Sequence, residues 1–185
     1  MVIAQNGPGI TGLVTPIKTA YWNHTPLLLV TPQAANKTMG QGGFQEVEQM
    51  NLFKDMVCYQ EEVRDPSRVA EVLNRVISKA IKGSAPAQLN IPRDFWTQVV
   101  DIELPAIINF ERPSGGSEAI NKAAKLLSNA KFPVILSGAG VILADAIDDC
   151  KKLAEKLSAP VACGYQHNDS FPGSHQLAIG PLGYN

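Results

Sequence analysis

Near its N-terminus the chain carries a glycine-rich turn, NGPGITG, in which Gly7–Gly12 match the G-x-G-x-x-G pattern of dinucleotide-binding loops. In that fingerprint, an acid about 20 residues further on binds the ribose hydroxyls. Here the next apolar run leads into Pro32 and Gln33, and the first carboxylate of the chain is Glu46. Pro8 also removes one backbone N–H from the loop. The motif therefore disfavours an NAD-binding oxidoreductase and on its own predicts a tight strand-to-helix turn.

A second glycine turn, SGAGV at Ser137–Val141, follows an apolar run and precedes a helical stretch. Such a turn can bring a phosphate to the N-terminus of a helix. Asp145, Asp148 and Asp149 lie near the start of that helix, where they would favour its dipole but repel a phosphate. A simple packing turn is therefore the favoured interpretation.

The third candidate is the loop Thr31–Gln49, TPQAANKTMGQGGFQEVEQ. It follows a strand end, where ligands collect in open α/β sheets, and it mixes glycines with amide side chains. Lys37 and Thr38 lack the preceding glycines of a phosphate-binding Lys-Thr motif. We expect Glu46 and Glu48 to occupy the solvated first turn of a helix. The loop is thus a ligand-binding candidate without a diagnostic motif.

The residue types and their spacing give little reason to expect a metal site or a hydrolase active site. His24, His167 and His175 are the only imidazoles, and His167, Asp169 and His175 lie in a stretch without metal-ligand spacing. No serine stands in a G-x-S-x-G context, so a hydrolase triad is not predicted. We predict no metal site in this chain.

The composition is that of a soluble globular protein, with 45% hydrophobic and 18% charged residues. A net charge of −1 gives no electrostatic reason to expect nucleic acid or an anionic membrane as a partner. No apolar run approaches the roughly 20 residues of a membrane span. Cys58, Cys150 and Cys163 form no C-x-x-C pair, which favours a reducing cytoplasm over a disulfide framework.

Short apolar runs alternate with amphipathic stretches, a pattern that predicts an α/β fold of parallel-sheet β-α-β layers. The clearest helix begins at Asp65-Pro66, a capping acid followed by proline, and ends at Gly83. Its apolar residues recur at the spacing of a helix that covers one face of a sheet. Further helices are expected over 117–129 and 144–157. The expected strands are Val2–Gln5, Leu27–Thr31, Met56–Gln60, Ala87–Ile91, Val134–Ser137 and Val161–Gly164.

Residues 101–116, DIELPAIINFERPSGG, interrupt this alternation, and we interpret them as an interdomain linker. Two α/β domains are therefore expected, over residues 1–100 and 117–185. Four strands in the first domain and two in the second are few for doubly wound sheets. We interpret the terminal GPLGYN as a glycine-rich turn. We accordingly expect the chain to be an internal fragment of a longer polypeptide.

Three segments, GPGITG, PLLLVTPQ and GQGGFQEVEQ, form an ordered set that resembles thiamine-diphosphate-dependent enzymes of the acetohydroxyacid synthase type. In that superfamily a GPG turn, a strand ending in a Gln-bearing loop and an F-Q-E segment follow one another in the pyrimidine-binding domain. The resemblance implies that residues 1–100 are the C-terminal part of that domain. It also implies that residues 117–185 are the N-terminal part of a Rossmann-like central domain. One departure is Gly12, where the family commonly has asparagine.

Longer stretches, among them KTAYWNHTPLLLVTPQAANKT, YQEEVRDPSR and APAQLNIPRDFWTQV, resemble a branch of this superfamily that acts on sulfoacetaldehyde. The resemblance implies an acyltransferase of taurine and sulfonate degradation, which converts sulfoacetaldehyde and phosphate into acetyl phosphate and sulfite. It further implies a cytoplasmic homo-oligomer, a dimer or a tetramer. The alternatives are an acetolactate-synthase-like carboligase or decarboxylase on the same scaffold and a non-catalytic α/β module.

By the same resemblance, thiamine diphosphate would be bound by Gly7, Pro8, Gly9, Thr11, Phe44 and Gln45. Pro8 and its flanking glycines would pack near the aminopyrimidine ring, and Gln45 would also contact substrate. The family's activating glutamate lies upstream of the GPG strand, and its G-D-G motif for Mg2+ and diphosphate lies in a later domain. This chain contains neither. We therefore expect the chain by itself to hold no metal and to be inactive.

Overall fold

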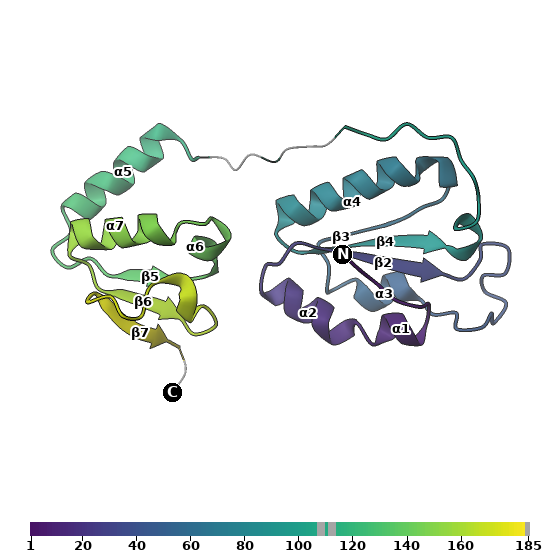
Figure 1. Cartoon of the computed structure of the whole chain (residues 1–185), viewed down its shortest axis with the longest axis horizontal. Helices are drawn as coiled ribbons and strands as arrows, with labels where there is room; N and C mark the ends of the chain where they lie inside the picture. The colour runs from purple at the N-terminus through teal and green to yellow at the C-terminus, as the bar shows by residue number, and fades with distance from the viewer. Residues whose placement is uncertain (107–109, 111–113, 184–185) are drawn as a thin grey trace. The chain divides into compact units, whose positions relative to one another are not determined.

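The computed structural model describes residues 1–106, 110 and 114–183 (Figure 1). The chain forms two compact units, Met1–Glu111 and Arg112–Asn185. Six residues of the predicted linker 101–116 and the last two residues of GPLGYN lie outside the described residues. Among the helices that the structure describes, none is long and apolar enough to cross a membrane.

The first unit is built on a four-stranded parallel sheet in which the strand order is β1-β2-β4-β3. Parallel pairing follows from the sequence because a helical stretch separates each strand from the next and returns the chain to the same edge. β2 and β4 are paired along their whole lengths, from Leu27 opposite Pro86 to Gln33 opposite Pro92. The strands are β1 Val2–Ile3, β2 Leu27–Gln33, β3 Tyr59–Glu62 and β4 Pro86–Pro92.

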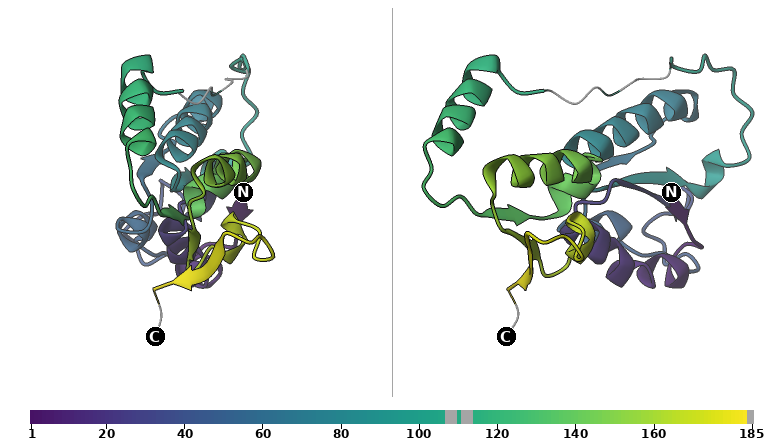
Figure 2. Two further views of the ribbon diagram at one scale, coloured as in Figure 1. Left: turned by 90° about the vertical axis from the view of Figure 1, so that its left-hand side faces the viewer. Right: turned by 60° about the vertical axis from the view of Figure 1, so that its left-hand side comes forward.

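Helices cover both faces of this sheet, and Figure 2 shows α4 on the opposite side from α1 and α2. α4 (Val69–Gly83) places its apolar stripe, including Val72 and Val76, on the face that carries Val30 and Leu89. The other face packs against the helices α1 Pro8–Thr11, α2 Val14–Trp22 and α3 Gln49–Phe53. The sheet is therefore buried on both sides, as the apolar runs of β2 and β4 predict.

The boundaries of α4 follow from its caps. The Asp65 carboxylate accepts a hydrogen bond from the backbone N–H of Ser67 at 2.9 Å, at the start of a 3-10 turn over Pro66–Arg68 that leads into α4. The helix ends where Ser84 adopts the left-handed conformation, at φ +46°. The predicted helix from Asp65-Pro66 to Gly83 is thus confirmed, with the difference that Pro66–Arg68 form a 3-10 turn and the α-helix itself spans Val69–Gly83.

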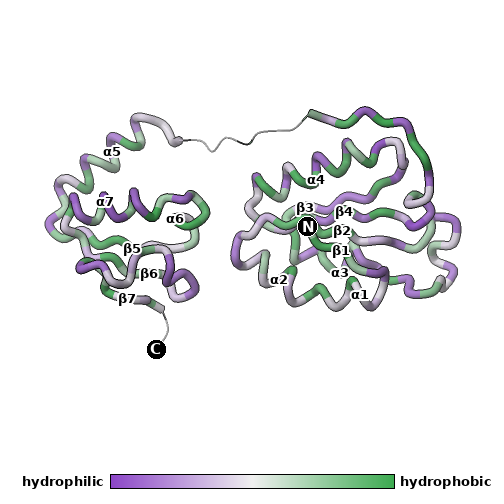
Figure 3. Tube along the Cα trace, viewed as in Figure 1, coloured by the Kyte–Doolittle hydropathy of each residue, from purple (hydrophilic) through white to green (hydrophobic). Residues whose placement is uncertain are grey.

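The second unit holds a three-stranded parallel sheet in the order β5-β6-β7, and its core contains Ala154, Val161, Cys163 and Phe171. Hydrophobic and hydrophilic residues are mixed along α5 and α7, as Figure 3 shows; α7 buries Ala154, whereas every residue of α5 is exposed. The elements are α5 Ser117–Ser128, β5 Ile135–Ser137, α6 Ala139–Leu143, α7 Ile147–Leu157, β6 Val161–Gly164 and β7 Ala178–Leu182.

The parallel-sheet α/β class is confirmed, but three local predictions were wrong. The third strand begins at Tyr59, because Val57 is buried in the core beneath α1 and α2 and belongs to the connection after α3. The helix expected over 144–157 begins only at Ile147, as α7, because Asp145 at φ +53° interrupts the chain there, and the short helix α6 just before it was not predicted. GPLGYN was interpreted as a turn, yet its first three residues end β7, which pairs with β6.

Candidate functional site

The predicted GPG site is a strand-to-helix turn with a backbone that requires glycine. Gly7 is the N-cap of α1 at φ +72° and ψ −111°, and Pro8 occupies the first helical turn, where its missing N–H leaves no hydrogen bond unmade. The Gly7 carbonyl accepts from the Thr11 N–H at 2.9 Å. The strand-to-helix interpretation of this turn is therefore confirmed.

This turn touches the F-Q-E segment, although almost forty residues of sequence separate them. A Cβ atom placed on Gly7 would lie 2.8 Å from both the Cβ and the carbonyl oxygen of Gln45. Beside this contact, the Gln5 amide Nε2 donates to Gln45 Oε1 at 2.9 Å. The structure thus brings together two of the segments that the sequence nominated, and it adds Gln5, which the sequence analysis did not single out.

The remaining predicted residues surround this contact with different degrees of exposure. Phe44 is 81% exposed, and Pro8 is also exposed. The Thr11 hydroxyl donates to the Pro8 carbonyl at 3.1 Å, within its own helical turn. Asn6, just before the turn, has a buried Oδ1 atom without a hydrogen-bond partner among the described residues. Apolar surface and one unsatisfied acceptor therefore lie next to the Gly7–Gln45 contact.

Glu46 does not occupy the first turn of a helix, contrary to the prediction. Its carboxylate accepts the backbone N–H of Gly40 at 2.6 Å through Oε1 and that of Gly43 at 3.1 Å through Oε2. α3 begins only at Gln49, with Glu48 at its N-cap position. Glu46 therefore closes a turn on the GQGG sequence immediately before Phe44 and Gln45.

Two buried glutamines fix the ends of the same loop. The Gln33 side chain accepts from the Ala34 N–H at 2.8 Å and donates to the Val47 carbonyl at 3.2 Å. The Gln49 amide donates to the Pro32 carbonyl at 2.6 Å. Both side chains are buried, Gln33 at 5% exposure and Gln49 at 0%. The loop therefore leaves β2 and enters α3 through polar contacts made by buried side chains.

A buried polar ladder continues from these glutamines across the same face of the sheet. Thr31 Oγ1 donates to Asn90 Oδ1 at 2.6 Å and accepts from Gln88 Nε2 at 2.9 Å. Gln60 Nε2 donates to Gln88 Oε1, and Asn90 Nδ2 donates to Glu62 Oε2, both at 2.6 Å. Residues two apart in a strand share a face, so one face of this sheet turns from apolar to polar toward its carboxyl end. Sequence reasoning missed this ladder, although the alternating polar residues of TPQ and QLN signalled it.

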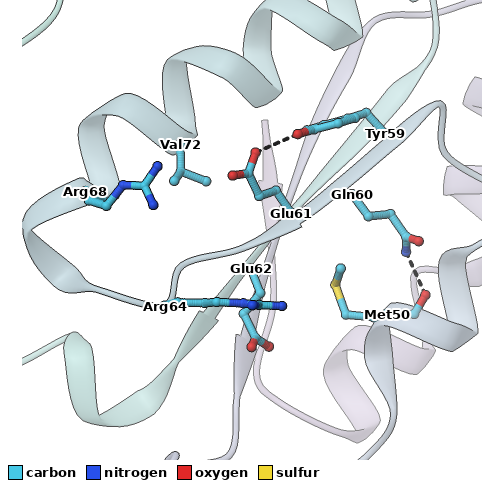
Figure 4. A pocket seen from close by; sticks show the side chains of 8 residues that line it. All are labelled: Met50, Tyr59, Gln60, Glu61, Glu62, Arg64, Arg68 and Val72. Carbon is cyan, nitrogen blue, oxygen red and sulfur yellow. Dashed lines mark hydrogen bonds between the residues drawn. The ribbon is translucent and has the colours of Figure 1, made fainter.

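A cavity of about 440 Å3 lies beside the edge strand β3, and Figure 4 shows the side chains around it. The Tyr59 hydroxyl donates to Glu61 at 2.7 Å, and Arg75 of α4 binds the same carboxylate at 2.8 Å. Hydrogen bonding to Arg75 holds the pKa of Glu61 below its usual range. The lining residues are Met50, Tyr59, Gln60, Glu61, Glu62, Arg64, Arg68 and Val72, so the cavity contains none of the predicted cofactor residues.

The second glycine turn has the features of a packing turn. Gly138 precedes α6 with an extended backbone, at φ −154° and ψ −162°, which other residues adopt equally well. The Ser137 hydroxyl donates to the Ser170 carbonyl at 3.0 Å, and Asp148 and Asp149 lie in the first turn of α7.

His175 lies 3.1 Å from Glu155. In the part of the chain that the structure describes, no three His, Cys, Asp or Glu side chains are grouped to hold a metal ion.

Comparison with known protein families gives two matches. Residues 1–52 match the N-terminal TPP binding domain of thiamine pyrophosphate enzymes. Residues 120–185 match the central domain of thiamine pyrophosphate enzymes. The first match contains the GPG turn, Gln45 and the loop between β2 and α3.

Curated relatives match the chain along its length. It is 78% identical to a sulfoacetaldehyde acetyltransferase of Roseovarius nubinhibens and 73% identical to a probable sulfoacetaldehyde acetyltransferase of Rhizobium meliloti, over 100% of the chain and 31% of each relative. It is 32% identical to a probable acetolactate synthase large subunit of Methanocaldococcus jannaschii, over 98% of the chain and 32% of that protein. The chain therefore spans about a third of the length of these relatives.

Among solved structures, the chain is similar to a thiamine diphosphate-dependent 4-hydroxybenzoylformate decarboxylase of Rhodococcus jostii RHA1. The TM-score is 0.87 at 26% sequence identity. The similarity covers 98% of this chain and 36% of the decarboxylase chain.

Proposed function

The chain belongs to the thiamine pyrophosphate enzyme family, and from that premise we propose that the protein containing it is a thiamine-diphosphate-dependent acyltransferase. Its reaction converts sulfoacetaldehyde and phosphate into acetyl phosphate and sulfite, a step of sulfonate degradation. The observation that carries this proposal is the 78% identity to a sulfoacetaldehyde acetyltransferase over the whole chain. Identity to the acetolactate synthase relative is less than half as high.

In this proposal residues 1–100 are the C-terminal part of the pyrimidine-binding domain and 117–185 the N-terminal part of the central domain, joined by the linker 101–116. The two family matches and the two compact units support this division. Mg2+ and the diphosphate group bind a domain outside this chain, and the enzyme is a cytoplasmic dimer or tetramer. The chain alone would therefore be inactive.

The residues around the GPG turn are chemically suited to a heterocyclic ring. Pro8 and Phe44 present exposed apolar surface on the two segments that meet at Gly7 and Gln45. The unpartnered, buried Asn6 Oδ1 is an acceptor for a ring N–H. Gly7, Pro8, Gly9, Thr11, Phe44 and Gln45 would hold the cofactor on this basis. When bound, thiamine diphosphate supplies a nucleophilic carbon that adds to carbonyl groups.

The role of Gln45 follows from how its amide is already engaged. Its Oε1 accepts from Gln5, so the amide is oriented and its Nε2 is directed away from that bond. This Nε2 has no hydrogen-bond partner within the described part of the chain. It is therefore free to donate to a substrate oxygen, including one that gains negative charge during carbonyl addition. Gln5 acts as the orienting residue for this donor.

The test uses the full-length protein with thiamine diphosphate, Mg2+ and sulfoacetaldehyde, with and without inorganic phosphate. We expect sulfite release and phosphate-dependent formation of acetyl phosphate. The acetolactate-synthase-like alternative predicts acetolactate from pyruvate alone, and that product without sulfite release would reject the proposal. The 185-residue chain, assayed in parallel, should show neither activity.

A further inference from the structure

We propose that Glu46 is a positioning residue that holds the Gly40–Gln45 turn and thereby presents Phe44 and Gln45 to the cofactor and substrate. This inference rests on the proposed function, because it assigns the two presented residues to the thiamine-diphosphate site. Glu46 itself touches neither group in the proposal. It acts through the loop backbone, with the buried Gln33 and Gln49 as anchors at the two ends.

Both oxygens of the Glu46 carboxylate are hydrogen-bonded. Each oxygen accepts a different backbone N–H, from Gly40 at 2.6 Å and from Gly43 at 3.1 Å. Hydrogen bonds to an ionised carboxylate are stronger than neutral ones. Gly40 and Gly42 have φ values of +81° and +70°, and a Cβ on either would meet nothing within 4 Å. Hydrogen bonds therefore hold this turn rather than packing at these glycines: the two that the Glu46 carboxylate accepts, and those that Gln41 donates to the Thr38 and Lys37 carbonyls.

The loop that contains this turn is anchored at both ends. Gln33 links Ala34, at the beginning of the loop, to Val47, near its end, through the two atoms of one buried amide. Gln49 ties the start of α3 back to Pro32 at the end of β2. Between these anchors the Asn36 N–H donates to Asp94 at 3.2 Å, and Glu46 closes the remaining part of the loop on itself.

The conformation of Gln45 depends on this support. Its backbone lies at φ +62°, a left-handed conformation that a non-glycine residue adopts only when its surroundings hold it there. Its Cβ and carbonyl oxygen face Gly7 so closely that a single added carbon on Gly7 would lie 2.8 Å away. A loop that relaxed by about an ångström would therefore lose the geometry of the Gln45 amide relative to the GPG turn.

The test compares Glu46→Gln and Glu46→Ala with Glu48→Gln in the full-length protein. Glu48 is a matched control, because it lies two residues away, is exposed, and its side chain makes no capping hydrogen bond to α3. Glutamine keeps one acceptor oxygen and loses the charge. Glu46→Gln should therefore reduce cofactor binding and kcat less than Glu46→Ala does. We expect Glu46→Ala to weaken thiamine diphosphate binding or lower kcat by about tenfold or more, and Glu48→Gln to leave both unchanged.

Amide hydrogen exchange of Gly40 and Gly43 separates this inference from the proposed function. Loss of the carboxylate should accelerate exchange at these two amides, whatever reaction the enzyme catalyses. If the wild-type enzyme makes no acetyl phosphate but exchange changes as expected, the proposed function fails and the loop role stands. Unchanged exchange in Glu46→Ala, or faster exchange with unaltered cofactor affinity and kcat, would overturn the positioning role. Circular dichroism checks that each variant folds.

Discussion

Gly7 and Gln45 lie in direct contact, with so little space between them that any side chain on Gly7 would meet the Gln45 backbone at 2.8 Å. The contact joins the turn after β1 to the loop after β2. It also explains why the two segments can serve one site, since neighbouring parallel strands bring their carboxyl ends to the same edge of the sheet.

Gly7→Ala should destabilise the protein more than Gly42→Ala. Both glycines have positive φ, at +72° and +70°, and alanine in such sparsely populated backbone regions costs about 1–3 kcal/mol, with the larger cost expected at Gly7, where ψ is −111°. Only the alanine at Gly7 also collides with Gln45, because nothing lies within 4 Å of a Cβ on Gly42. Urea denaturation of both variants measures the difference. An equal decrease in the free energy of unfolding of both variants would show that the Gly7–Gln45 contact can relax.

Gly9→Val should weaken thiamine diphosphate binding by the full-length protein. A Cβ on Gly9 already lies 3.2 Å from Ala4 Cβ and 3.3 Å from Gln5 Cβ, so the added branches of valine must displace the strand or the turn. Gly12→Ala is the control, since its Cβ makes only 3.5 Å contacts with two carbonyl oxygens. Isothermal titration with the cofactor is the measurement. Unchanged affinity in Gly9→Val would count against the placement of the ring at this turn.

Thr31→Val should lower the free energy of unfolding by about 1–3 kcal/mol, although valine nearly matches threonine in shape. The substitution leaves the buried Asn90 Oδ1 without its donor and removes an acceptor of Gln88 Nε2. Thr25→Val, at an exposed position between α2 and β2, should change stability by less than about 0.5 kcal/mol. Denaturant titrations of the two variants compare the sites directly. A neutral Thr31→Val would mean that the ladder repairs itself around the lost hydroxyl.

Glu61→Gln should destabilise the protein at neutral pH and lose this effect in acid. The pKa of Glu61 is lower in the folded state than its ordinary value, chiefly because Arg75 binds the carboxylate. The stabilisation is therefore fully present above the ordinary carboxyl pKa of about 4.3 and declines as pH falls through the lower folded value. Unfolding measured between pH 7 and pH 3 should show the wild-type and variant curves converging. A difference that stayed constant with pH would exclude the charged pair as its source.

Local sequence signals predicted several elements accurately, and the reason is that the relevant contacts are short-range. Asp65, Pro66 and the apolar stripe up to Gly83 contain the start, the face and the end of α4. The third strand was misplaced because Met56 and Val57 are apolar enough to resemble a strand, whereas Val57 is buried by helices that lie elsewhere in the sequence. β7 was missed because Gly180 and Pro181 interrupt its sequence and only its pairing with β6 defines it.

The sequence by itself determined the α/β class, the α4 boundaries and the family resemblance, because these depend on spacing and on residue order. Only the tertiary structure decided that Gln45 faces Gly7, that Gln5 orients its amide, and that Glu46 holds a turn rather than beginning a helix. Each of these depends on where a loop returns after leaving its strand. Spacing along the chain does not encode that position. It is set by the pairing of β1, β2 and β4 and by the buried contacts of Gln33 and Gln49.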